Sequence, residues 1–399
     1  MTNFGCAIWE CVDGLCGGHA LIEQAEIEQA GIEQAGIEQT ELTAAPGSCD
    51  KGHPKPLRFA HRSLLLSNIY FLIGAENSPY SIKVRSYLRY KGIPHAWLKR
   101  SQAAELYQQH AKLPLVPLLV TPEGLGIQDS TPIIEAVEAQ LPTPSIVPAD
   151  PITAFVSTLL EEFGDEWGNK WMFHYRWARD ADQIAAARRL VLDGNPGISE
   201  EKLQVNAAAI RERMVPRVWF VGSNEMTAPQ IEASFVAALR LLETHLSTRA
   251  FIAGGRPCSA DFALWGQIYN AAKDPTPRSI IAAYPAVQAW LARLVDGLPE
   301  GEFEPWTALA PTLMPLLREQ VAGLFLPWSD ANARAITAGQ AEFSVQLGSA
   351  AAATTQWQQK PQKYHARSLA ILRNRYAQAR SPALDAVLDA AGATRWLAS

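Results

Sequence analysis

A serine at the expected start of a helix is the best-placed side chain for chemistry in this 399-residue sequence. The run Asn68–Ile73 is β-branched and aromatic, which predicts a buried strand, and a short loop then leads to Ser78 and Pro79. Serine is a preferred N-cap and proline a preferred first helical residue, so we expect a helix from here to about Tyr90. The unpaired N–H groups and the dipole at such a helix start favour a thiolate.

No cysteine lies near this helix start. Ser78 and Ser81 have the spacing at which a redox-active C-x-x-C helix carries its two thiols, so dithiol redox chemistry is excluded. Two interpretations of Ser78 stay open: its hydroxyl donates a hydrogen bond to a bound thiolate, or it only caps the helix.

An aromatic segment near residues 155–177 could line a substrate pocket. Two rows of side chains recur there at i+4 spacing. The first row is Leu159, Phe163, Trp167 and Trp171, and the second is Glu162, Glu166, Lys170 and His174. Three interpretations stay open: an aromatic core stripe beside a solvated Glu–Lys row, a pocket lined by Trp171, His174 and Arg176, or a metal site built on the Glu and His side chains.

The elements that must position these residues alternate between strand and helix as far as residue 140, in the order β-α-β-α-β-β-α. A stretch with four prolines, 142–151, follows and predicts a stiff linker. The chain beyond it is predicted to be helical, in segments near 152–179, 181–193, 199–214, 228–247, 259–273, 284–296 and 308–323. Two or three more helices are predicted from about residue 330 onward.

Residues 22–41 repeat a five-residue unit, IEQAE or a close variant. A period of five advances about 140° per repeat on an α-helix, so the isoleucines would spiral around it and never form an apolar stripe. The predicted organisation is a disordered leader (1–66), an α/β domain (67–141), the linker (142–151), an all-helical domain (152–327) and a helical extension (328–399).

Charge and cysteine content exclude several classes of protein. Residues 1–64 hold nine acids and four bases and so carry the whole net charge of −5, which leaves a neutral body and no large nucleic-acid surface. The longest mostly apolar run, Leu64–Ala75, is too short to span a bilayer. Only Cys258 lies beyond residue 49, so no disulfide framework is expected, which fits the cytoplasm.

The pattern resembles the glutathione transferase family over about residues 68–325. Three features carry the resemblance: SPYSIKVRSYL after a strand (Ser78–Leu88), LVPLLV (Leu115–Val120), and Gln128-Asp129-Ser130 at a helix start. The segments GGRPCSADFALWGQIYNAAKDPTPR, EEFGDEWGNKWMFHYRW and QKYHARSLAILRNRY are similar to a bacterial branch of the family. The resemblance implies a thioredoxin-like domain followed by an all-helical domain. It also implies that Asp261 is a buried helix cap with a structural role.

The resemblance also implies a glutathione site. Ser78 would activate the glutathione thiol and Ser81 would help to bind the peptide. Val116 and Pro117, joined by a cis bond, would offer backbone groups to its cysteinyl part. Asp129 and Ser130 would hold its γ-glutamyl end, although both residue types also simply cap helices. The acceptor pocket would be built from Tyr80, Trp171, His174 and Arg176.

The activity implied is conjugation of glutathione, as co-substrate, to a small electrophile, or its use in reductive cleavage. The SPYS form of the site is similar to that of bacterial ether-cleaving members. A homodimer is implied by the family, and neither a metal nor a nucleic-acid partner is expected. The alternative is a binding or interaction protein that kept the fold without catalysis.

Overall fold

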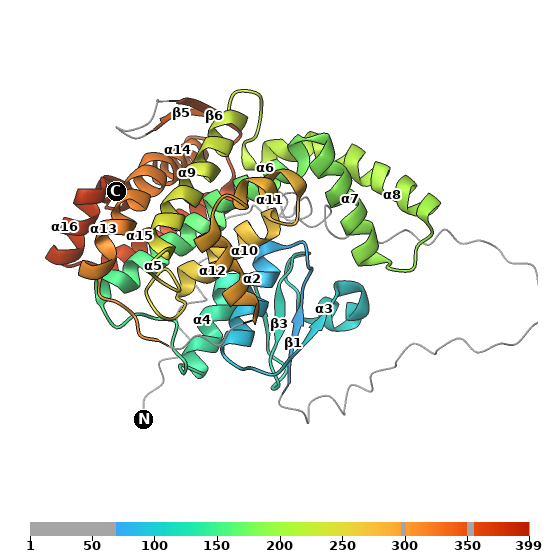
Figure 1. Ribbon diagram of the computed structural model, residues 1–399, viewed down its shortest axis with the longest axis horizontal. Helices are drawn as coiled ribbons and strands as arrows, with labels where there is room; N and C mark the ends of the chain where they lie inside the picture. The colour runs from blue at the N-terminus through green and yellow to red at the C-terminus, as the bar shows by residue number, and fades with distance from the viewer. Residues whose placement is uncertain (1–68, 297–300, 349–354, 399) are drawn as a thin grey trace, which may run out of the picture.

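The computed structural model describes residues 69–296, 301–348 and 355–398 (Figure 1). The predicted leader, 1–66, lies outside the described residues. No helix in the described part of the chain is long and apolar enough to cross a membrane.

A four-stranded sheet forms the N-terminal domain, in the order β2-β1-β3-β4. Its strands are β1 (Tyr70–Ile73), β2 (His95–Leu98), β3 (Leu118–Val120) and β4 (Gly126–Gln128). β1 pairs parallel with β2 and antiparallel with β3, with Phe71 opposite Ala96 and Val120, and β3 pairs antiparallel with β4. This mixed sheet confirms the predicted thioredoxin-like arrangement.

Helices cover both faces of the sheet (Figure 1). They are α2 (Pro79–Tyr90), α3 (Ala104–His110) and α4 (Ser130–Gln140). Tyr107 of α3 packs with Ile73, Leu118 and Val120 on one face. α2 and α4 contact each other, and Leu72, Leu119 and Ile133 join the main core on the opposite face.

The helical domain follows the expected segments closely. Its first long helix comprises α5 (Pro151–Phe163), a π-helical turn (Gly164–Gly168) and α6 (Asn169–Ala178). The rest are α7 (Asp180–Gly194), α8 (Glu200–Met214), a 3₁₀ segment (Val215–Val221), α9 (Ala228–Leu246), α10 (Ser259–Ala271), α11 (Pro275–Ile281), α12 (Pro285–Asp296) and α13 (Trp306–Leu316). α7 and α8 form a hairpin with a small core of its own, which includes Ala187, Leu190 and Met214.

The C-terminal extension is helical but contains a hairpin that the sequence analysis did not expect. α13 continues through a π-helical segment (Leu317–Phe325) into α14 (Leu326–Thr337), so helix runs across residues 327 and 328. The hairpin strands are β5 (Phe343–Leu347) and β6 (Thr355–Gln359), and α15 (Lys363–Ala379), α16 (Pro382–Ala391) and α17 (Thr394–Leu397) follow. The alternation of FSVQL, which buries Phe343 and Leu347, is the strand signal in the sequence.

α10 is the central helix of the molecule and has contacts with α2, α5, α6 and α12. Asp261 caps it as predicted, since Oδ2 accepts the backbone N–H of Cys258 at 2.9 Å. Its Oδ1 accepts the backbone N–H of Ile252 and the indole N–H of Trp290. Gly266 brings α10 against α2, because a Cβ there would lie 2.7 Å from the carbonyl oxygen of Pro79.

We expect Gly266→Ala to destabilise the protein by about 1–3 kcal/mol, because the new methyl group meets backbone that cannot move without shifting α2. The control is Gly197→Ala, where the nearest atom to an added Cβ is 4.0 Å away. Denaturant unfolding measures both. Equal unfolding free energies for the two variants would show that α2 and α10 can separate without cost.

Candidate functional site

Ser78 is the N-cap of α2, as the sequence predicted. Its Oγ accepts the backbone N–H of Ser81 at 3.2 Å, which satisfies one of the unpaired donors of the first turn. A hydroxyl both accepts and donates, so its proton stays available to an acceptor in front of the helix. Ser78 is only 2% exposed and is one of the residues that line a small chamber.

That chamber lies between the two domains and has a volume of about 60 Å³. Ser78, Tyr80 and Val116 line it from the thioredoxin-like domain, and the Val116–Pro117 peptide bond is cis. The opposite wall is mostly apolar and comes from α6, α7, α8 and the 3₁₀ segment: Met172, Phe173, Trp177, Leu190, Met214, Phe220 and Val221. The α7–α8 hairpin therefore forms part of this wall.

The four residues expected in an acceptor pocket separate into two pairs. Tyr80 and Arg176 line the chamber, and the Tyr80 hydroxyl donates to the backbone oxygen of Asp165 at 2.9 Å. Trp171 lies in the core, where its indole N–H donates to Ser234 Oγ at 3.1 Å. His174 is also buried and away from the chamber, between Ser223 and Glu232.

All three side-chain nitrogens of Arg176 donate hydrogen bonds, to the loop before α2, to α10 and to the N-cap of α11. Its Nη1 donates to the backbone oxygen of Asn77 and its Nη2 to Asn270 Oδ1, both at 3.0 Å. Its Nε donates to Asp274 Oδ2 at 3.3 Å. Arg176 therefore fixes the position of the residue before Ser78.

Asp129 and Ser130 begin α4 and do not line the chamber of Ser78. Asp129 has a φ of +82°, and its Oδ1 accepts the backbone N–H of Ser130 at 2.7 Å. Its Oδ2 accepts the hydroxyl of Tyr364, at 3.3 Å, from α15 of the extension. Burial raises the pKa of the Asp129 carboxyl. Sequence reasoning missed Tyr364, because no local pattern shows that residues 129 and 364 meet.

The interpretation of Glu162, Glu166, Lys170 and His174 as a solvated row is wrong. Glu166, Lys170 and His174 are at most 4% exposed, and Ser368 of α15 donates to Glu162. Lys170 is enclosed by three tryptophans, with Nζ 3.7 Å from the ring centre of Trp328, and burial lowers its pKa. The stripe from Leu159 to Trp171 is core, as one interpretation held. Side chains of the C-terminal extension cover the Glu–Lys row. The i+4 spacing within one helix cannot show that a distant segment packs on it.

A buried ion-pair cluster joins the helical domain to α2, the helix that Ser78 caps. Lys83 Nζ lies 2.7 Å from Glu161 Oε1 and 2.6 Å from Asp165 Oδ2, and it also donates to Thr131 at 3.2 Å. These contacts hold the pKa of Lys83 above its usual range although burial opposes them. Burial raises the pKa of Asp165, and Lys83 only partly offsets this effect.

Two more acids of this segment, the half-buried Glu162 and the buried Glu166, lie beside α15. Burial, reinforced by the charge of Glu166, raises the pKa of Glu162 to about 8. Burial also raises the pKa of Glu166 to about 8, and its side chain contacts His365. The folded protein therefore holds protons on carboxyl groups that would be ionised in water at neutral pH. Within the described ranges, no cluster of His, Cys, Asp or Glu side chains is arranged to hold a metal ion.

We expect the free energy of unfolding to fall as the pH rises from about 5 to 8. The folded pKa of Glu162 lies above its unfolded value, so unfolding releases a proton in this window and becomes easier as the pH rises. Glu162→Gln resembles the protonated carboxyl and should be more stable than wild type at pH 8 by at least about 1 kcal/mol. Urea unfolding at pH 6 and 8 measures this effect.

The exposed Glu201 of α8 provides the control for that experiment. Glu201→Gln should leave the pH dependence of the parent protein in place. A Glu162→Gln variant with the same decline between pH 6 and 8 would mean that Glu162 is already ionised in the folded state.

Two family models match the chain in order. Residues 77–140 match the N-terminal domain of glutathione S-transferase, and residues 207–293 match its C-terminal domain. The first match contains Ser78, Val116, Pro117, Asp129 and Ser130. The second match begins within α8. No curated protein matches the chain.

Solved structures of low identity were also found. A glutathione S-transferase from Methylobacterium radiotolerans in complex with glutathione sulfonate is 21% identical, over 59% of this chain and 97% of that chain, with a TM-score of 0.36. The β-etherase LigF from Sphingobium is 20% identical over 57% and 93%, with a TM-score of 0.36. A Tau class transferase from mango is 18% identical over 61% and 96%, with a TM-score of 0.35. These TM-scores lie below 0.5 and do not by themselves establish a common fold.

Proposed function

This chain belongs to the glutathione S-transferase family, and we propose that Ser78 activates the thiol of glutathione for attack on a small electrophile or for reductive cleavage. The observation that carries the proposal is the hydrogen bonding of Ser78. Its oxygen accepts from Ser81 N, so the hydroxyl keeps a proton to donate, and Ser78 lines the chamber between the domains. A thiolate there would receive this proton as well as the field of the helix start.

Glutathione would extend from this point as the family resemblance implies. Val116 lines the same chamber as Ser78 and would pair its backbone groups with the cysteinyl part of the peptide. Asp129 and Ser130 would bind the γ-glutamyl end, with Ser130 and the helix N–H groups on its carboxylate and Asp129 on its ammonium. Ser81 supports the site through its backbone N–H. Glutathione is then a co-substrate, and the protein supplies the activated thiolate.

We expect Ser78→Ala to lower turnover by roughly 10- to 150-fold, because a hydrogen bond to a charged sulfur is worth about 1.5–3 kcal/mol. The pKa of the bound thiol should rise by about one to two pH units. Loss of the cap should cost only about 1 kcal/mol of stability. Thiolate absorbance of the glutathione complex, titrated against pH, measures the effect directly.

Ser81→Ala is the matched control, because it keeps the backbone N–H that contacts Ser78 and removes a hydroxyl one turn away. Its titration should follow that of wild type. If Ser78→Ala leaves the thiol pKa unmoved while Ser81→Ala or Tyr80→Phe shifts it, another hydroxyl activates the thiol.

The second candidate function is a binding or interaction protein without catalysis. The size of the chamber favours it, since about 60 Å³ is well below the roughly 300 Å³ or more of typical ligand sites. A protein that is neither retained on immobilised glutathione nor active with an aryl halide would support this function. Retention with turnover would show that the α7–α8 hairpin opens to admit both substrates.

We also propose a homodimer, as the family implies, with a cytoplasmic location and a role in detoxification. Cys258, the single cysteine of the described residues, is a buried free thiol, which supports a reducing compartment. Sedimentation at micromolar concentration should give two chain masses, and one chain mass would contradict the dimer. Cell fractionation tests the location.

A further inference from the structure

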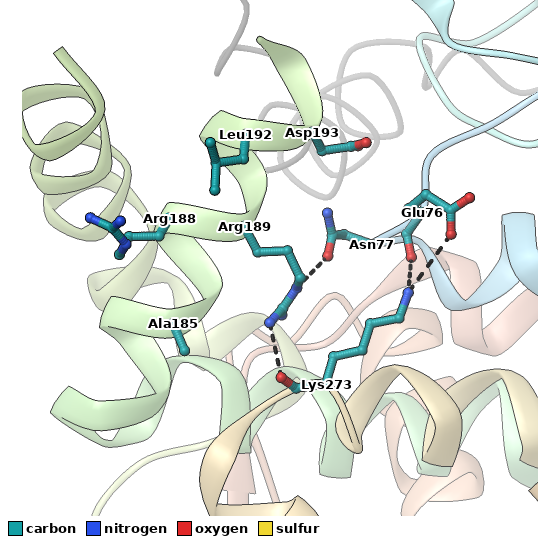
Figure 2. A pocket seen from close by; sticks show the side chains of 8 residues that line it. All are labelled: Glu76, Asn77, Ala185, Arg188, Arg189, Leu192, Asp193 and Lys273. Atoms are coloured by element: carbon teal, nitrogen blue, oxygen red, sulfur yellow. Dashed lines mark hydrogen bonds and ion pairs between the residues drawn. The ribbon is translucent and has the colours of Figure 1, made fainter. Parts of the chain in front are cut away.

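A second hollow opens on the other side of the residue before Ser78. It is a groove of about 550 Å³ between α7, the loop of Glu76 and Asn77, and the turn after α10 that carries Lys273 (Figure 2). Asn77 lines both this groove and the chamber of Ser78. The groove therefore lies beside the proposed thiolate and is large enough for a small organic molecule.

The side-chain amide of Asn77 has a fixed orientation. Arg189 Nε can only donate, and it donates to Asn77 Oδ1 at 2.7 Å, so the amide nitrogen must be on the other side. Figure 2 shows this nitrogen facing away from Arg189, toward the part of α7 that carries Leu192 and Asp193. Asn77 is 1% exposed, and its Nδ2 has no hydrogen-bond partner among the described residues. Buried hydrogen-bond donors in native proteins nearly always have an acceptor, so this donor indicates a bound group that accepts a hydrogen bond.

The groove has an excess of positive charge. Three of the residues that line it are cationic, Arg188, Arg189 and Lys273. Two are carboxylates, Glu76 and Asp193, which leaves a net charge of +1. Lys273 Nζ donates to the backbone oxygen of Glu76 at 2.5 Å and lies 4.0 Å from Glu76 Oε2, and an ammonium has three N–H donors, so it can also donate to a ligand. An anion would therefore be favoured here.

The charge excess also affects the acidity of Lys273. Burial lowers the pKa of its ammonium to about 8, against the opposing charge of Glu76, and the guanidinium groups of Arg176 and Arg189 add to the lowering. Beside these polar groups, Ala185 and Leu192 of α7 supply an apolar wall. The groove thus combines hydrogen-bond donors and positive charge with an apolar wall that can contact the hydrocarbon part of a ligand.

We propose that this groove binds the carboxylate of the electrophilic substrate, with Asn77 Nδ2 and Lys273 Nζ donating to its oxygens. The inference rests on the proposed function and names its substrate class: small organic acids whose reactive carbon reaches the thiolate at Ser78 while the carboxylate lies in the groove. Asn77 and Lys273 are then specificity-determining residues.

Calorimetric titration with two product analogues tests the proposal without requiring turnover. S-benzylglutathione lacks the carboxylate, and S-(4-carboxybenzyl)glutathione carries it. The wild-type protein should bind the carboxylated compound roughly tenfold or more tightly, as expected for a charge-assisted hydrogen bond. The ratio of the two dissociation constants is the readout, because it cancels general effects on the glutathione site.

Two variants should abolish that preference. Asn77→Asp keeps the acceptor for Arg189 and replaces the amide donor with a second carboxylate oxygen. Lys273→Gln removes the ammonium, and the exposed Lys202→Gln on α8 removes the same charge outside the groove, so only the latter should keep the preference. Circular dichroism confirms that each variant is folded.

The outcomes separate the inference from the function on which it rests. Equal affinities of the wild-type protein for the two compounds overturn the groove assignment and leave glutathione binding intact. A preference that persists in both variants places the carboxylate elsewhere and also overturns it. If neither compound binds, the proposed function fails and the inference fails with it.

Discussion

The buried contact of α2 with the helical domain is the constraint on which the candidate site depends. Gly266 lets α10 approach the backbone of Pro79, and Lys83 joins α2 to Glu161 and Asp165 through ion pairs below 3 Å. Removing one partner from such a buried pair leaves an uncompensated charge, which is far more costly than loss of a surface pair. Ser78 begins the same helix, so its position relative to the opposite wall is set by these contacts.

A two-substrate reaction needs a site for each substrate, and two hollows with different properties lie beside Ser78. The small chamber has mostly apolar walls and contains the hydroxyl, while the larger groove is open and positively charged. Asn77 separates them, held by Arg176 through its backbone oxygen and by Arg189 through its side chain. α7 lines both hollows, so movement of the α7–α8 hairpin would change both together.

The C-terminal extension is part of the site region and not an appendage. Tyr364 contacts Asp129, His365 contacts Glu166, and Ser368 contacts Glu162, so α15 covers the acidic turn and the start of α4. This covering explains why carboxyl groups with raised pKa values gather there: the extension removes them from water, and only some of them gain a cationic partner. A family relationship over the first two domains could not indicate this arrangement.

The sequence by itself determined the elements and the position of Ser78, because capping, proline placement and hydrophobic periodicity are local properties of the chain. The order of strands and helices up to residue 140 and the segments of the helical domain followed from such signals, while the cap at Asp261 was implied by the family resemblance. Only the tertiary structure decided that Glu166, Lys170 and His174 are buried, that FSVQL pairs with a second strand, and that Asn77 lies between two hollows. Burial and partner choice depend on segments far away in the sequence, such as Asp129 and Tyr364, which are 235 positions apart, and no local pattern carries that information.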